Sequence, residues 1–142
     1  MRLRESVSIE APLDRVWSIV ADLDSEPRYW RGTVAVRNSA RHEDVVEREV
    51  VVAGGRAVQR ERVRFEPPYR VVHEIFSGPI RGFKVLELRA RAEGGVELTA
   101  TWDVLPRGLL RLFQRSFARH VAEGTRNALH RIREAAEGRS SA

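Results

Sequence analysis

The middle of the chain, residues 33–105, is a series of short alternating segments separated by turn signals. The clearest alternation covers residues 96–104, where apolar and polar side chains take turns at every position. A period of two is typical of a strand with one buried face. The glycine pairs at 54–55 and 94–95 suit tight hairpins, because glycine adopts positive φ without strain. The pattern predicts strands at residues 3–11, 33–41, 45–53, 56–66, 69–77, 83–92 and 96–105.

Two short helices are expected between the first two strands. Pro12 suits the first turn of a helix, where its missing N–H costs no hydrogen bond. Apolar residues then recur at helical spacing up to Leu23, which predicts a short amphipathic helix. A second short turn is expected over residues 25–30, before Gly32.

The segment after the strands, residues 109–137, is predicted to form one long amphipathic helix. At about 100° per residue, its apolar residues fall on one face and five arginines fall on roughly the opposite face. The apolar face consists of Leu110, Phe113, Phe117, Val121, Gly124, Ala128, Ile132 and Ala135. This face needs a cover, and so does the apolar face of a seven-stranded antiparallel sheet.

The expected fold is therefore α+β, with a curved antiparallel sheet wrapped around the C-terminal helix. One helix cannot cover seven strands edge to edge, so the sheet should leave an apolar space beside it. Such a space is the physical basis of a ligand cavity. The length of 142 residues suits one domain, expected over residues 1–137. Residues 138–142 are expected to form a flexible tail.

The chain is basic, with a formal net charge of +5, which raises the question of a nucleic-acid partner. Of its 25 basic residues, however, 24 are arginine and only Lys84 is a lysine. A phosphate-binding surface usually mixes the two types, so this bias is more typical of genome composition. Base stacking would also need exposed aromatic residues among the arginines of the last helix, and that face has none. We therefore expect no DNA partner, and the pattern does not favour RNA or ribosomes.

Composition excludes several kinds of site. The chain has no cysteine, which rules out disulfides and thiolate metal sites. His42, His73, His120 and His130 lie far apart and show no metal-ligand spacing. With no common nucleotide-binding, hydrolase or metalloprotease motif, we expect neither a metal nor another cofactor. The lack of a signal-peptide pattern and of an apolar run of about 20 residues favours the cytoplasm.

Two stretches near the N-terminus carry a family resemblance. They are residues 8–17, Ser-Ile-Glu-Ala-Pro-Leu-Asp-Arg-Val-Trp, and residues 22–30, Asp-Leu-Asp-Ser-Glu-Pro-Arg-Tyr-Trp. Together with Trp102-Asp103-Val104 and the long final helix, they resemble the START/SRPBCC superfamily, which includes the birch-pollen allergens. Within it, the chain is most similar to the polyketide cyclase/dehydrase and coenzyme-Q-binding-like groups.

The resemblance covers essentially the whole chain and implies a START/SRPBCC-like helix-grip domain. In that fold a curved seven-stranded antiparallel sheet grips the C-terminal helix around a hydrophobic cavity. Members bind lipids, quinones, polyketides or hormones, and a minority are cyclases, dehydratases or hydrolases. The matching motifs are packing and turn residues, so they specify the fold better than the function.

Large aromatic side chains are the first candidates for a ligand-binding wall, because their rings offer broad contact area. These candidates are Trp30, Phe76, Phe83, Trp102, Phe113 and Phe117. His73 and His120 are the polar candidates, able to orient a ligand or exchange a proton near neutral pH. The plainer interpretations are core packing for the aromatic residues, an outward His73, and a His120 that is hydrogen-bonded at the edge of the helix.

Acidic residues on the expected strands alternate with arginines. Cross-strand ion pairs on the solvent face are the simplest interpretation of this pattern. A carboxylate directed inward would instead have a raised pKa and could act in catalysis. The pattern does not select which of Glu49, Glu61 and Glu87 that would be, and no catalytic residue is assigned.

The first hypothesis is a non-enzymatic protein that transports or chaperones a hydrophobic small molecule, such as a lipid, quinone or polyketide, in an internal cavity. The alternative is a polyketide cyclase or dehydratase that uses the same cavity with an acid–base residue. A third hypothesis is an adaptor that meets ribosomes or an acidic membrane surface through Arg111, Arg115 and Arg119. The apolar start of the last helix would suit a cavity portal or a peripheral membrane contact.

Overall fold

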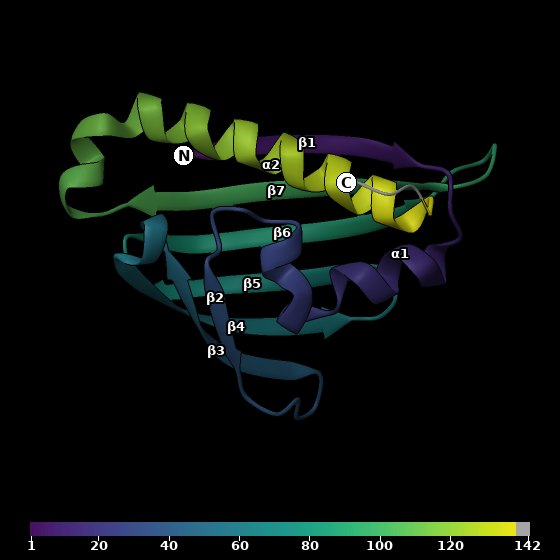
Figure 1. Cartoon of the computed structure of the whole chain (residues 1–142), viewed down its shortest axis with the longest axis horizontal. Helices are drawn as coiled ribbons and strands as arrows, with labels where there is room; N and C mark the ends of the chain where they lie inside the picture. The colour runs from purple at the N-terminus through teal and green to yellow at the C-terminus, as the bar shows by residue number, and fades with distance from the viewer. Residues whose placement is uncertain (139–142) are drawn as a thin grey trace.

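The computed structural model in Figure 1 describes residues 1–138 and contains seven strands. They are β1 (Arg2–Ile9), β2 (Ala35–Asn38), β3 (Val45–Val52), β4 (Ala57–Glu66), β5 (Arg70–Ser77), β6 (Ile80–Ala90) and β7 (Val96–Pro106). All neighbours pair antiparallel, in the order β1-β7-β6-β5-β4-β3-β2. The number and orientation of the strands confirm the prediction from alternation. Of the expected tail, residues 139–142 lie outside the described residues.

The helical segments are α1 (Leu13–Val20), η1 (Leu23–Arg28), η2 (Ala53–Gly55), η3 (Gly108–Phe113) and α2 (Gln114–Ala136). The long helix α2 runs along β1 and β7, and α1 and η1 lie over the middle of the sheet (Figure 1). This is the predicted α+β arrangement, with one face of the sheet covered by helices. In the described part of the chain, no helix is both long and apolar enough to cross a membrane.

The single helix expected from residue 109 is divided in the structure. Residues Gly108–Phe113 form the separate 3-10 turn η3, and α2 begins only at Gln114. None of the residues of η3 is buried. Helices in proteins are stabilised mainly by packing of an apolar face, and of η3 only Leu110 packs against a core cluster, so little holds this turn in line with α2.

Two strands also differ from their expected bounds. At the edge of the sheet, β2 spans only Ala35–Asn38, and short edge strands are common because they limit pairing with other chains. In contrast, β6 begins at Ile80, three residues earlier than expected, and runs through Gly82. Gly82 has a φ of +141°, and a side chain there would collide with the backbone of Asp103 in β7. Glycine at this position therefore allows close pairing and does not mark a turn.

The larger part of the apolar core lies between the sheet, α1 and the C-terminal half of α2. Its fully buried members include Ile9 of β1, Val16 of α1, Leu98 of β7, and Leu129 and Ile132 of α2. These residues occupy the apolar phase of each strand or helix, as the periodicity predicts.

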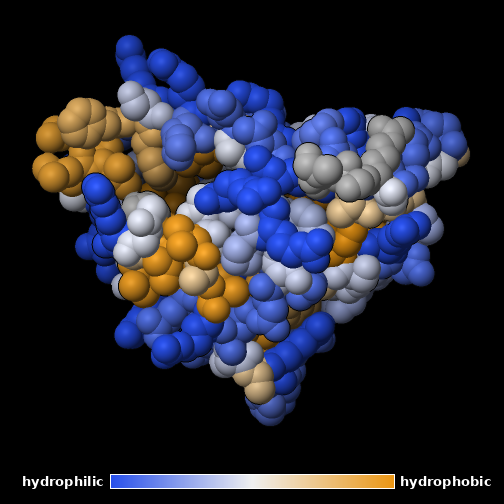
Figure 2. Space-filling view, in the orientation of Figure 1, coloured by the Kyte–Doolittle hydropathy of each residue, from blue (hydrophilic) through white to orange (hydrophobic). Residues whose placement is uncertain are grey.

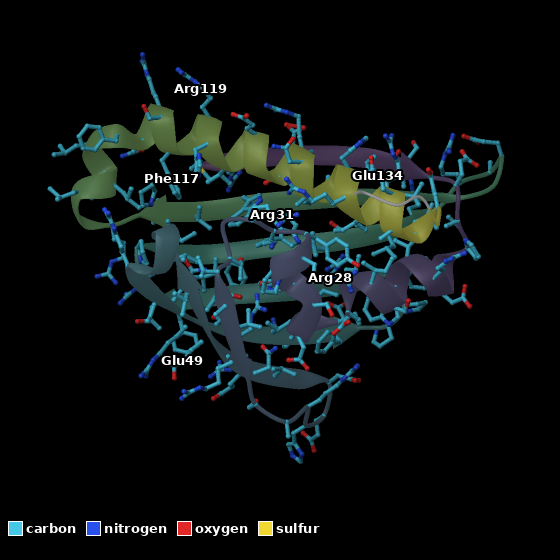
Figure 3. The ribbon with its side chains drawn as sticks, viewed as in Figure 1. Arg28, Arg31, Glu49, Phe117, Arg119 and Glu134 are labelled. Carbon is cyan, nitrogen blue, oxygen red and sulfur yellow. The ribbon has the colours of Figure 1, made fainter. Side chains whose placement is uncertain are left out.

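A smaller apolar cluster lies at the other end of the sheet. Ile75, Ile80 and Val104 form it, and Phe117 from the first turns of α2 packs against them. In Figure 3, Phe117 lies on the sheet-facing side of α2 and Arg119 points away from the sheet. Trp102 packs against both clusters, so it marks the boundary between the two parts of the core.

Candidate functional site

Five titratable side chains are buried together on the inner face of the sheet. We call Glu26, Arg48, Glu61, His73 and Lys84 the titratable cluster; each is at most 7% exposed. Strands β3, β4, β5 and β6 contribute one member each, and η1 contributes Glu26 from the opposite side. Charged residues are almost never fully buried unless they are paired, so this arrangement needs a specific explanation.

Strand register places the cluster in one band across the sheet. Arg48 of β3 pairs directly with Glu61 of β4, and His73 of β5 pairs with Lys84 of β6. Lys84 in turn pairs with Trp102 of β7. Each of these residues occupies the inward phase of its strand, because alternate side chains point to the same face. A band of polar groups therefore crosses an otherwise apolar surface.

Arg48 joins the two carboxylates of the cluster. Its Nη2 donates hydrogen bonds to Glu26 Oε1 at 3.0 Å and to Glu61 Oε1 at 2.7 Å, and its Nε donates to Glu61 Oε1 at 3.0 Å. Gln59 Nε2 donates to the second oxygen of Glu61 at 2.6 Å. Both carboxylates thus have strong, charge-assisted partners, which offset part of the cost of burial.

The charges in the cluster shift the pKa values of its members. Burial by itself would raise the pKa of Glu26 and Glu61. Arg48, with Lys84 and His73, lowers the pKa of Glu26 below its ordinary value, and the contacts with His73 and Arg48 do the same for Glu61. The same two carboxylates raise the pKa of Arg48 against the effect of its own burial. Both acids are therefore ionised at neutral pH, and Arg48 is their counter-ion.

His73 is neutral at neutral pH. Burial is the largest effect on its pKa and lowers it; the hydrogen bond with Glu61 acts in the opposite direction, and the positive charges of Arg48 and Lys84 lower the pKa further. Nδ1 lies 3.0 Å from Arg48 Nη2 and 3.3 Å from Glu61 Oε1. The other ring nitrogen, Nε2, is buried and has no partner among the described residues. An unpaired buried polar group costs about 1–3 kcal/mol, which favours a polar partner at this position.

Lys84 contacts aromatic rings instead of carboxylates. Its Nζ lies 3.3 Å from the centre of the Trp30 ring and 5.2 Å from that of Trp102. Burial lowers the pKa of Lys84 to about 8, although Glu26 and Glu61 act in the opposite direction. The two rings meet edge to face at 6.2 Å. Lys84 is thus held by cation–π contacts, and roughly one tenth of its amine is unprotonated at pH 7.

Trp102 connects this band to the long helix. Its Nε1 donates to Thr125 Oγ1 of α2 at 3.0 Å, and that hydroxyl donates to the carbonyl of Val121 at 2.7 Å. Thr125 is itself buried. The site therefore extends from β3 across the sheet to α2, and a change in the position of the helix would move Trp102 and the ring face that holds Lys84.

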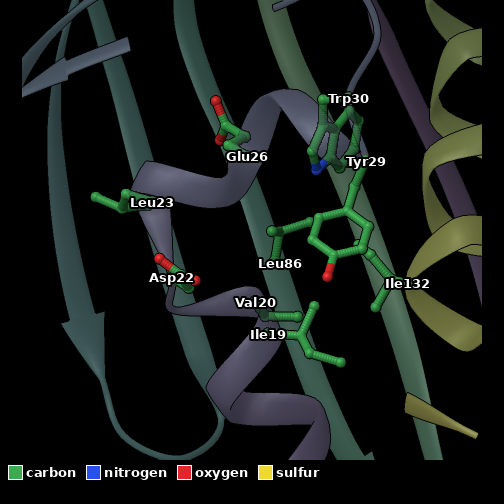
Figure 4. A pocket seen from close by; sticks show the side chains of 9 residues that line it. All are labelled: Ile19, Val20, Asp22, Leu23, Glu26, Tyr29, Trp30, Leu86 and Ile132. Atoms are coloured by element: carbon green, nitrogen blue, oxygen red, sulfur yellow. The ribbon is translucent and has the colours of Figure 1, made fainter. Parts of the chain in front are cut away.

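The interior around the cluster is closely packed. Beside Glu26 and Trp30, above Leu86 of β6 and Ile132 of α2, lies a cavity with a volume of about 10 Å³ (Figure 4). Such a volume holds about one water molecule. At this position between η1, the sheet and α2, the structure thus has no room for the large apolar cavity expected from the sequence.

The structure brings together only some of the residues expected to bind a ligand. Trp30, His73 and Trp102 all meet at Lys84. Phe117 lies in the smaller apolar cluster, away from the charged groups.

Phe76 and Phe83 do not face the interior as expected. Both lie on the outer face of the sheet, 40% and 42% exposed. Strand alternation explains the difference: His73 and Phe76 are an odd number of positions apart on one strand, so they cannot share a face. Phe113 and His120 are also exposed, since Phe113 precedes α2 and His120 lies on its solvent side.

The sequence did not predict Glu26, Arg48 or Lys84 as members of a site, and it left open which carboxylate faces inward. Glu61 is the inward carboxylate, whereas Glu87 is exposed and Glu49 is only half-buried. Arg48 and Lys84 were not singled out, although each stands in the apolar phase of its strand. No group of three or more histidine or acidic residues in residues 1–138 is arranged to hold a metal ion.

Comparisons with known proteins agree with this architecture. The family model described as "Polyketide cyclase / dehydrase and lipid transport" matches residues 1–137. No curated protein matches the chain.

Several solved structures have the same fold. The Zhui aromatase/cyclase from Streptomyces sp. R1128 is similar with a TM-score of 0.81 and 19% identity, over 96% of this chain and 93% of that one. The protein TTHA0849 from Thermus thermophilus gives 0.75 and 19%, over 95% and 99% of the two chains. The di-domain aromatase/cyclase StfQ of the steffimycin pathway gives 0.77 and 11%, over 96% of this chain and 50% of that one.

At these identities the solved structures support the fold alone, whereas the family match extends over nearly the entire sequence. The chain belongs to the SRPBCC polyketide cyclase/dehydrase and lipid transport family.

Proposed function

We propose that the chain binds a hydrophobic small molecule that also carries oxygen groups, with its polar end at the titratable cluster. The observation that carries this proposal is the burial of five titratable side chains in one band of the interior. Replacing buried ion pairs by apolar residues often leaves a protein as stable or more stable, so stability alone does not explain the cluster. Perturbed titratable groups gathered in one place are instead typical of functional sites.

The arrangement favours an oxygenated ligand over a plain hydrocarbon chain. Two buried nitrogens point to polar groups on the ligand: His73 Nε2 and Arg48 Nη1 have no partner among the described residues. An apolar ligand would leave both unpaired, whereas a hydroxyl group, which donates and accepts, would satisfy either of them. The apolar cluster around Phe117 would receive the rest of the molecule. Polyketides combine both features, and the family name includes them.

Binding can be tested with two ligands of the same carbon skeleton. Isothermal titration calorimetry would compare 1,3-dihydroxynaphthalene, a fused-ring molecule of the polyketide type, with naphthalene. We expect the hydroxylated ligand to bind at least about tenfold more tightly, since one satisfied buried hydrogen bond contributes about 1–1.5 kcal/mol. The variant His73→Phe should lose this preference. Equal affinity for the two ligands, or no binding of either, would contradict the proposal.

A second candidate function is a cyclisation or dehydration reaction in the same interior. It is favoured by the neutral state of His73 beside the ionised Glu61, 3.3 Å from its Nδ1. A neutral histidine near a carboxylate can move a proton at neutral pH, as such reactions need. Turnover of a poly-β-ketone by the native chain that disappears in His73→Phe, while naphthalene still binds to the variant, would distinguish an enzyme from a binding protein.

A further inference from the structure

Lys84 is the single lysine in a chain that otherwise uses arginine for every basic side chain. Arginine occupies the other 24 basic positions, and nearly all of them are at the surface or in surface ion pairs, whereas Lys84 is 5% exposed at the centre of the site. The two residue types differ chemically, because a guanidinium stays protonated and is not nucleophilic under these conditions. An amine can lose its proton and attack carbon. The only lysine of the chain thus lies at the centre of the site, where an amine that can lose its proton behaves differently from a guanidinium.

The surroundings of Lys84 differ from those of Arg48, its neighbour in the cluster. Arg48 takes both carboxylates, Glu26 and Glu61, as direct partners. No carboxylate in residues 1–138 forms an ion pair with Lys84, whose Nζ instead lies against the ring faces of Trp30 and Trp102. Burial without a direct counter-ion lowers the pKa of Lys84 to about 8. Roughly one tenth of the molecules then carry the free amine at pH 7, against far less than one hundredth for an exposed lysine.

We propose that Lys84 is a nucleophile that captures a carbonyl group of the bound molecule as an imine. The ligands it selects are aldehydes and ketones, including the β-diketone unit. This inference rests on the proposed function, because the ligand must first enter the interior at the titratable cluster.

The step balances without an oxidant or a reductant. The lone pair of Nζ forms a bond to the carbonyl carbon, and the electrons of the carbonyl π bond move to oxygen. Both protons of the amine then leave with that oxygen as water, and a carbon–nitrogen double bond remains. The neighbouring groups suit each stage: the imidazole of His73, cross-strand from Lys84, can exchange a proton with the departing oxygen, and the carboxylates of Glu26 and Glu61 stabilise the iminium that forms on protonation.

The probe for this inference is acetylacetone, a β-diketone that condenses with a free amine to a stable, ultraviolet-absorbing enaminone. We expect the full chain to gain the mass of one acetylacetone less one water, with the adduct mapped to Lys84 by peptide mass spectrometry. The rate should rise about tenfold per pH unit below pH 8 and level off above it, following the free amine of Lys84. The α-amino group of Met1, which donates to the carbonyl of Val104, is the other primary amine in the chain.

A matched variant tests whether the reactivity depends on the buried position of Lys84 or is shown by a lysine at an exposed position as well. The double variant Lys84→Arg/Arg81→Lys keeps one lysine in the chain, on the same strand but on its exposed outer face. We expect it to react at least about tenfold more slowly at pH 7, because an exposed amine keeps its ordinary pKa. The single variant Lys84→Arg should form no adduct at position 84.

Three outcomes would overturn the inference: no adduct at all, an adduct only on the amino group of Met1, or equal rates of lysine modification in the native chain and the double variant. If 1,3-dihydroxynaphthalene still binds while acetylacetone does not react, the imine fails and the proposed function stands. If 1,3-dihydroxynaphthalene does not bind and acetylacetone does not react, both the imine and the proposed function fail.

Discussion

Two regions of the molecule depart from the usual distribution of polarity. The interior buries charged side chains, and the η3 end exposes apolar ones. Inside, the five side chains of the titratable cluster are at most 7% exposed. At the far end of β7, the exposed apolar end, which we define as Leu105, Leu109, Leu112 and Phe113, is 61–77% exposed. Figure 2 shows the apolar surface gathered where η3 lies, at the left of the view. Buried charges and exposed apolar patches are the two observations that most often mark function.

The two regions differ in how their members depend on one another. In the titratable cluster every carboxylate has Arg48 as its partner, so the loss of one group leaves another buried and unpaired. At the exposed apolar end the side chains have no buried partners. The effect of a substitution should therefore be large in the interior and small at the end, and this difference can be measured.

The largest effect is expected from Arg48→Met. The variant removes the counter-ion of Glu26 and Glu61 and leaves two buried carboxylates, so the free energy of unfolding should fall by about 3–5 kcal/mol. The control Arg62→Met breaks a half-exposed pair with Glu47 on the outer face and should cost at most about 1 kcal/mol. Urea denaturation of both variants checks this. Equal losses would mean that the cluster contributes no more than a surface ion pair.

The next effect is a change of stability with pH that comes from Lys84. The unfolded chain keeps this proton up to the ordinary pKa of 10.5, but the folded chain releases it above about 8. Between these values the unfolded state binds more protons, so raising the pH stabilises the fold, by about 3 kcal/mol over the whole window.

The measurement compares the native chain with Lys84→Met at several pH values between 8 and 10.5, so that other titrations cancel. The native chain should gain stability relative to the variant as the pH rises. Parallel curves would show that the amine of Lys84 has the same pKa in both states and would also weaken its role as a nucleophile.

A smaller effect is expected where the site meets α2. Thr125→Val removes the acceptor of the indole N–H of Trp102, and the unpaired donor should lower the free energy of unfolding by about 1–2 kcal/mol. Thr101→Val, one position before Trp102 and on the outer face of β7, should change it by less than about 0.5 kcal/mol. If the two variants behave alike in thermal and urea unfolding, the bond between sheet and helix contributes nothing.

Local pattern was enough to predict the sheet but not which of its residues form the site. Alternation identified all seven strands, because the period of two is set by each strand alone. The same alternation could have found part of the cluster. Lys84 occupies the phase of Leu86, and Arg48 that of Val46, so each is a charge where an apolar residue is expected. In contrast, the prediction of Phe76 and Phe83 as ligand-binding residues used the size of their side chains and not the face of the strand on which each lies.

Other parts of the site depend on contacts that no local pattern contains. Glu26 reaches the cluster only because η1 crosses the sheet, and its partner Arg48 lies 22 positions later in the chain. The division of η3 from α2 has the same origin, since the amphipathic pattern continues through both and only tertiary packing ends the helix. The small volume of the interior likewise results from how the side chains of several elements fill it.

The smallest effect is expected at the exposed apolar end. Phe113→Gln should change the free energy of unfolding by less than about 0.5 kcal/mol, because the ring is 61% exposed and contributes little burial. Phe117→Gln, one helical turn later, should cost about 2 kcal/mol or more, since Phe117 packs on Ile75, Ile80 and Val104. A similar cost in both variants would mean that η3 is part of the core. A clear difference would mean that the apolar residues of this end contribute little to the stability of the fold, in contrast to the interdependent charges of the interior.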